Sequence, residues 1–216
     1  LDSDMPPGTL ARALVTCTEA KTAAIQELMA GSNYSTGLAT GSGTDQTMII
    51  ANAESELYLE STGKHSKTGE LIGKVVMRAV KGALYKETGL CPSSQHSALM
   101  RFKRFKVTED TLWDRFKERN DRDIIKPVFL EILDSIEKDS FIVTNTSLYI
   151  HLLDQYLWGL LEEKEVVVCA QKILLLIGEK YGVKANNILT EASVEAFNTA
   201  WPEVLVEILY EKAAES

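Results

Sequence analysis

The sequence predicts an α+β fold, with a sheet and packed helices in the N-terminal half and an all-helical C-terminal half. Two observations lead to this prediction. Short segments with strand-like alternation lie between two helical patterns in residues 1–107, and helical periodicity dominates residues 108–216. We therefore expect an α+β region over residues 1–107, followed by a helical extension over residues 108–216.

The first helix is expected to follow Pro6-Pro7-Gly8. Proline suits a first helical turn, because its missing N–H group would have no helical partner there, and Gly31 suits the helix end. Between them, apolar residues recur at helical spacing. These residues are Leu10, Ala13, Leu14, Cys17, Ala24, Ile25 and Leu28.

Three strands are expected after this helix. Residues 34–40 and 46–52 lie on either side of a glycine-rich loop, and residues 56–61 alternate apolar and polar side chains cleanly. We expect these strands to form the sheet on which the helices pack.

A second helix is expected from Thr68, a plausible N-cap, to about Lys86, with Gly89 and Pro92 closing it. Beyond residue 108 the pattern is helical, and only residues 141–143 carry a weak strand signal.

Composition excludes several classes of protein. The 216 residues include 23 basic and 31 acidic side chains, and a net charge of −8 argues against a nucleic-acid surface. The three cysteines lie far apart, which fits a reducing cytoplasm, and the histidines are too scattered for a metal cluster. The longest apolar run, residues 166–177, is shorter than the roughly 20 residues that span a bilayer. We expect a cytoplasmic protein without nucleic-acid or membrane partners.

Three polar stretches carry the functional signal. In the first, residues 18–22, Thr18, Lys21 and Thr22 share one face of the expected helix, and Glu19 lies one turn from Thr22. A solvated helix face would also explain this stretch, and it is the favoured interpretation when the stretch is taken alone.

The second stretch, residues 40–45, is Thr-Gly-Ser-Gly-Thr-Asp between two expected strands. Glycines at alternate positions allow backbone N–H groups to turn toward a ligand oxygen. It is not a dinucleotide fingerprint, because Gln46 stands where the third glycine would be. A flexible hairpin loop is an equally good interpretation of this stretch by itself.

The third stretch, residues 63–73, joins an expected strand to a helix start, where free N–H groups and the helix dipole favour an oxyanion or a phosphate. Its glycine spacing is not that of a Walker loop. A lone histidine such as His65 is more often structural than catalytic, but the polar side chains around it favour a site. These neighbours are Lys64, Ser66, Lys67 and Glu70.

Taken together and in order, the three stretches resemble the motifs of the adenosylcobinamide amidohydrolases of cobalamin salvage. The family's E-A-K-T-A segment corresponds to residues 19–23, and its A-T-G-T-G-T-D loop corresponds to residues 39–45, with Ser42 in place of threonine. Its G-K-H-[ST]-K-L-G-E-L-I-G segment corresponds to residues 63–73, with Thr68 in place of leucine.

The resemblance covers roughly residues 9–106 and explains nothing in residues 110–216. It implies hydrolysis of the amide between a corrin-ring side chain and the aminopropanol of adenosylcobinamide, giving adenosylcobyric acid. The corrinoid is then the expected partner, and its cobalt belongs to the substrate, so no separate cofactor or metal is expected. The family usually has a further segment before the E-A-K-T-A helix. We therefore also expect an N-terminal segment of the same protein, or a companion chain, to take part.

Amide hydrolysis needs a base for water, donors for the oxyanion and an acid for the departing amine. Under the resemblance, His65 or Asp45 would activate water and Glu19 would orient a lysine such as Lys21. These four residues are the expected catalytic set, lining one cleft on the order of 10 Å across. The expected substrate-binding residues are Thr22, Thr40, Gly41, Ser42, Gly43, Thr44, Lys64, Ser66, Lys67 and Glu70. An acyl-enzyme through a hydroxyl of the glycine-rich loop is an open alternative.

Two other functions compete with the hydrolase. The first region could bind corrinoid without catalysis, or it could be a degenerate hydrolase domain attached to a helical interaction module. In the second case, residues 101–106, Arg-Phe-Lys-Arg-Phe-Lys, would give the module a basic edge, although alternating aromatic and basic residues are also a common solvated pattern on an edge strand.

Overall fold

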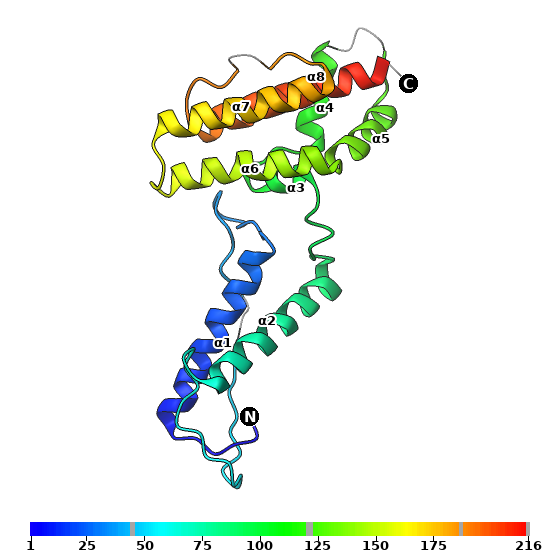
Figure 1. The fold of residues 1–216 in the computed structure, drawn as a ribbon. Coiled ribbons are helices and arrows are strands. Elements are labelled where there is room, and N and C mark those ends of the chain that lie inside the picture. Colours follow the sequence, from blue (N-terminus) through cyan, green and yellow to red (C-terminus); the bar gives the residue numbers. More distant parts are fainter. Residues whose placement is uncertain (44–45, 120–122, 186–187, 215–216) are drawn as a thin grey trace. The chain divides into compact units, whose positions relative to one another are not determined.

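A computed structural model describes residues 1–43, 46–119, 123–185 and 188–214 of the chain. These residues form two compact units, Leu1–Gln95 and His96–Ser216 (Figure 1). The expected functional division at residue 107 stays a prediction. Among the described residues, no helix has both the length and the apolar content to cross a membrane.

The first unit is built on two long helices that pack against each other, α1 (Pro7–Glu27) and α2 (Lys67–Thr88). Helix α1 begins at Pro7, as predicted, and α2 ends at Gly89, whose φ of 72° lies in the left-handed region that glycine adopts without strain. Ser66, and not Thr68, is the N-cap of α2, because the Ser66 hydroxyl oxygen accepts the Gly69 N–H at 3.1 Å.

The expected α+β fold is wrong, because the described residues contain helices but no sheet. Residues 34–40, 46–52 and 56–61 were all expected to be strands, yet β pairing stops at two isolated bridges. One bridge joins Gly31 to Leu38, and the other joins Asp4 to Tyr58. Alternation predicts which residues suit a strand, but a ladder also needs a neighbouring strand to pair with.

The N-terminal residues come closest to forming such a ladder. The Asp4 N–H donates to the Leu57 carbonyl at 2.8 Å, and the Leu59 N–H donates to the Asp4 carbonyl at 3.0 Å. On the other side, the Asn52 N–H donates to the Ser3 carbonyl at 3.1 Å. Residues 3 and 4 therefore lie between two extended segments without making a regular sheet.

The second unit is helical. Its elements are α3 (Ala98–Phe102), the 3₁₀ turn η1 (Lys103–Phe105), α4 (Glu109–Arg119), α5 (Lys126–Glu137), α6 (Ser140–Leu157), α7 (Glu163–Tyr181) and α8 (Val194–Ala214). The weak strand expected at residues 141–143 is instead the first turn of α6. The cause is Asp139, whose carboxylate accepts the Phe141 and Ile142 N–H groups at 3.0 and 3.1 Å and so caps the helix.

The core of the second unit gathers around α8. Trp201 is buried, stacks on Phe102 with ring centroids 4.3 Å apart, and donates its indole N–H to the Thr146 hydroxyl at 3.0 Å. Arg104 forms a buried ion pair with Asp154 on α6. Residues 101–106 therefore form no edge strand, because they lie at the end of α3 and in η1, with their aromatic side chains in the core and Arg104 paired there.

Candidate functional site

Helix α1 positions the loop that precedes α2. The Thr16 hydroxyl donates to the Thr62 carbonyl at 3.0 Å, and this contact is buried. About two turns earlier on the helix, Thr9 donates to the Glu60 carbonyl at 2.7 Å and accepts the Thr62 hydroxyl through its own carbonyl at 2.6 Å. These side-chain bonds satisfy carbonyls that lack ladder partners, and they fix the chain just before Gly63.

The same helix holds the start of the glycine-rich loop. The Thr22 hydroxyl donates to the Thr40 carbonyl at 2.8 Å, and the Gln26 amide donates to the Ala39 carbonyl at 3.5 Å. Thr16 and Thr22 are six residues apart, so the two loops are anchored about 9 Å apart along the helix axis at 1.5 Å per residue. All three polar stretches are therefore tied to one helix.

An open groove of about 680 Å³ runs along α1. It is lined by Leu14, Val15, Thr18, Glu19, Thr22, Ala23 and Gln26. Its volume lies within the range of small-molecule sites, and its lining mixes apolar side chains with the hydroxyls and carboxylate of the first stretch.

Arg12 links the first stretch to the third, and sequence analysis did not identify it. Its guanidinium lies 4.0 Å from the Glu19 carboxylate, with both side chains nearly half exposed. The Arg12 side chain also lies against Gly63, where a Cβ atom would come within 3.3 Å of Nε. The sequence spacing indicates this contact, because Arg12, Thr16 and Glu19 follow i, i+4 and i+7 and so lie on one face of the helix.

Glycine is required where α2 begins. A Cβ atom on Gly69 would lie 2.0 Å from the Gly63 carbonyl oxygen and 2.8 Å from the Thr62 carbonyl oxygen. The Ser66 hydroxyl in turn donates to the Gly63 carbonyl at 2.8 Å. The turn that carries Lys64 and His65, both exposed, is therefore pressed directly onto the first turn of α2.

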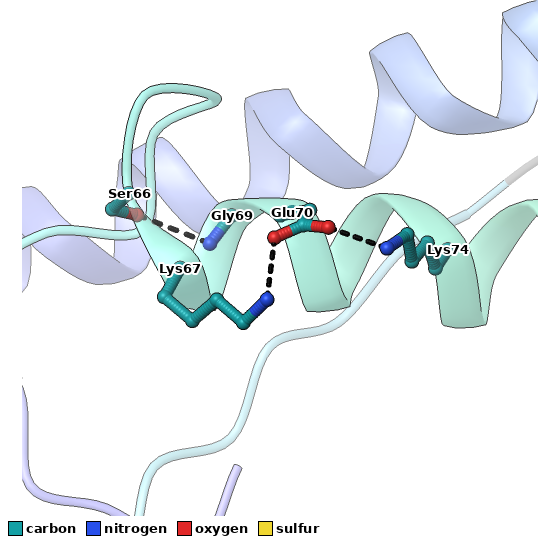
Figure 2. Close-up of polar contacts among 5 residues, drawn as sticks. All are labelled: Ser66, Lys67, Gly69, Glu70 and Lys74. Carbon is teal, nitrogen blue, oxygen red and sulfur yellow. Dashed lines mark hydrogen bonds and ion pairs between the residues drawn. The ribbon is translucent and has the colours of Figure 1, made fainter.

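Two lysines hold Glu70 between them. Figure 2 shows Lys67 and Lys74 pointing at the two carboxylate oxygens, and the Lys67 ammonium lies 2.7 Å from the nearer one. The hydrogen bonds and charges of these lysines lower the pKa of Glu70 to about 2. Glu70 is therefore ionised at neutral pH and is not available as a proton donor to a leaving amine.

The structure thus joins some of the predicted site residues and leaves the roles of the others as predictions. Thr22 meets Thr40, Glu19 reaches the third stretch through Arg12, and Ser66 caps α2. The other predicted positions are distributed as follows. Gly41, Ser42 and Gly43 are exposed, Lys21 is half-buried on α1, and Thr44 and Asp45 lie outside the described residues. Within the described part of the chain, no group of three His, Cys, Asp or Glu side chains could hold a metal ion.

Comparison with known proteins agrees with these motifs. Residues 1–92 match the model of the family described as adenosylcobinamide amidohydrolase, which confirms the resemblance over this part of the chain. An uncharacterized protein of Methanocaldococcus jannaschii is 42% identical over 87 residues, which are 40% of this chain and 33% of that protein. The chain therefore spans about a third of the length of this curated relative. No solved structure matches the chain.

Proposed function

We propose that the first unit hydrolyses the amide between the corrin-ring side chain and the aminopropanol of adenosylcobinamide, giving adenosylcobyric acid. The family match over residues 1–92 supports the reaction class. The observation that carries the proposal is the anchoring of both loops on α1 by Thr16 and Thr22, beside a groove that contains Glu19.

In this reaction, the oxygen of water bonds to the amide carbonyl carbon, the C–N bond breaks, and aminopropanol leaves after its nitrogen gains a proton. His65, in the exposed turn before α2, is the proposed proton carrier, because an imidazole exchanges protons near neutral pH. Asp45 is the alternative base. The N–H groups of Gly41 to Gly43, or the start of α2 with its helix dipole, would stabilise the oxyanion.

Charged groups around the turn would position the substrate. Glu19 and Arg12 form an ion pair that extends from the groove to the third stretch, so this pair would orient the corrin side chain between the two loops. Lys64 and Lys21 would add positive charge. The corrinoid cobalt is part of the substrate and takes no part in the hydrolysis.

The test is a pair of histidine variants. His65→Gln keeps a hydrogen-bonding side chain that cannot titrate, and it should slow hydrolysis by about 10²–10⁴-fold with little change in corrinoid binding. The matched control is His96→Gln, which changes an exposed histidine of the second unit and should leave the rate unchanged.

Two results would contradict the proposal in different ways. If His65→Gln keeps most of the activity, the histidine only orients its neighbours and the base must be sought at Asp45 or Glu19. If the unmodified chain binds adenosylcobinamide and never changes its mass, the first unit is a corrinoid-binding module.

A further inference from the structure

Helix α6 has an outer face that is free of Asp, Glu, Lys and Arg. All 18 of its residues are described, and the only charged residue of these types among them is Asp154, which is buried in its ion pair with Arg104. A stripe of exposed and half-buried positions, spaced alternately by four and three residues, consists of Thr144, Leu148, His151, Gln155 and Trp158. A surface helix normally presents charged residues to water, whereas such residues are scarce at the centre of protein interfaces. The outer face of α6 therefore indicates a packing partner.

Two large apolar side chains of this stripe are exposed. Leu148 and Trp158 are 54% and 55% exposed. The Trp158 ring lies nearly perpendicular to the His151 ring, with ring centroids 6.4 Å apart. Tryptophan is enriched among the residues that contribute most to the binding energy of protein interfaces. The stripe thus has the composition of an interface centre and not that of a solvated helix face.

Helix α7 extends this face beside α6. The two helices pack against each other and run in opposite directions (Figure 1). The Lys180 ammonium lies 4.4 Å from the centre of the Phe141 ring, so this side of α7 adjoins the first turn of α6. Counting back from Lys180 by four and three residues alternately gives the other members of this side, Leu176, Ile173, Cys169, Val166 and Glu162. We call this stripe and the α6 stripe together the α6–α7 face.

The α6–α7 face has opposite charges at its two ends. Glu162 and Lys180, both exposed, are 18 residues apart, which is five full turns of a helix. Glu162 follows Trp158 closely at one end, and Lys180 lies beside Phe141 at the other. A second copy of the chain, rotated by half a turn about an axis through the middle of the face, places its own Lys180 against Glu162 and its own Glu162 against Lys180. Two attractive pairs then flank the apolar residues between them.

We propose that the chain forms a twofold-symmetric dimer through the α6–α7 face of its second unit. The occupant of the face is a second copy, because the charges at its ends match those of a copy that runs in the opposite direction. The dimer holds two first units in one particle. This proposal goes beyond the amide hydrolysis and is tested by association alone, so either proposal can fail while the other stands.

The test is sedimentation velocity of the full chain over a range of concentrations. We expect a reversible equilibrium between monomer and dimer. Leu148→Asp should raise the dissociation constant at least about tenfold, because it buries an unpaired carboxylate in each copy. Leu71→Asp is the matched control, since Leu71 is a 51% exposed leucine on a helix of the first unit, and it should leave the equilibrium unchanged.

Charge reversal tests the orientation of the two copies. Lys180→Glu sets two carboxylates against each other at both ends of the dimer, and Glu162→Lys sets two ammonium groups there. Each variant alone should therefore weaken dimerisation by about tenfold at low ionic strength. An equal mixture of the two variants should recover the dimer, because each pair then joins opposite charges again. This recovery also shows that both variants are folded.

Three results would overturn the proposal. The first is a monomer at every concentration, because a second copy then does not occupy the face. The second is a dimer that Leu71→Asp weakens as much as Leu148→Asp, because association then does not depend on the α6–α7 face. The third is a mixture of the Lys180→Glu and Glu162→Lys variants that associates no more strongly than either variant alone.

Discussion

Replacing Gly69 with alanine should damage both the fold and the site of the first unit. The added Cβ atom would lie 2.0 Å from the Gly63 carbonyl oxygen and 2.5 Å from its carbon. Ordinary contact at 3.4 Å would require the turn to move away from α2 by roughly 1.4 Å. Such overpacking costs about 1–3 kcal/mol, and displacing a reacting group by about 1 Å lowers a rate by up to roughly 10²-fold.

Gly73→Ala is the matched control, one turn further along the same helix. A Cβ atom on Gly73 meets nothing within 4 Å, so this change should stabilise α2 by about 0.5–1 kcal/mol through its higher helix propensity. The assay is amide hydrogen exchange along α2 at increasing urea concentrations. All three tryptophans lie in the second unit, so tryptophan fluorescence should show an unchanged transition in both variants. Equal stabilities for Gly69→Ala and Gly73→Ala would refute the close approach of the loop to α2.

Three further predictions concern Asp139, Asp154 and Cys91. Burial raises the pKa of Asp139, but hydrogen bonds from two N–H groups of α6 and from Tyr181 lower it by more. The ionised carboxylate therefore stabilises the fold at pH values above its unfolded pKa of about 3.9. This stabilisation is lost as the pH falls through the lower folded pKa. Asp139→Ala should cost about 0.5–2 kcal/mol in urea unfolding at pH 7, Asp139→Asn much less, and equal losses would contradict the capping role. Asp154→Ala should cost about 3–5 kcal/mol by the same measurement, because it leaves the Arg104 cation buried without its carboxylate, and a loss below about 1 kcal/mol would contradict this burial. Hydrogen bonds from Ser93 and Ser94 lower the pKa of Cys91 to about 7, so iodoacetamide should alkylate it with a midpoint near pH 7 that Ser93→Ala moves upward, and an unmoved midpoint would refute the cause.

The two long helices of the first unit were predictable because their signals are local. Pro7 and Gly89 mark helix ends through their own backbone preferences, and the N-cap of α2, Ser66, lies two residues before the predicted N-cap, Thr68. The sheet was not predictable from the same information. Residues 56–61 alternate like a strand, but only one of them, Tyr58, forms a bridge, because a ladder depends on partners that alternation does not specify.

Two local signals were present in the sequence but were not used. Phe102 and Phe105 are three residues apart, which places them on one side of a helical turn and not on alternate faces of a strand, and both are buried. Arg12 is seven residues before Glu19, which puts both on one face of α1. The common cleft expected for His65, Glu19 and Asp45 depends on how two loops that are far apart in the sequence approach each other. It stays a prediction.

The most direct test is the mass of the corrinoid after incubation with the chain. We predict that adenosylcobinamide is converted to adenosylcobyric acid with release of aminopropanol, and that His65→Gln slows the conversion by about 10²–10⁴-fold. Bound but unchanged adenosylcobinamide would contradict the claim that the first unit is an amidohydrolase.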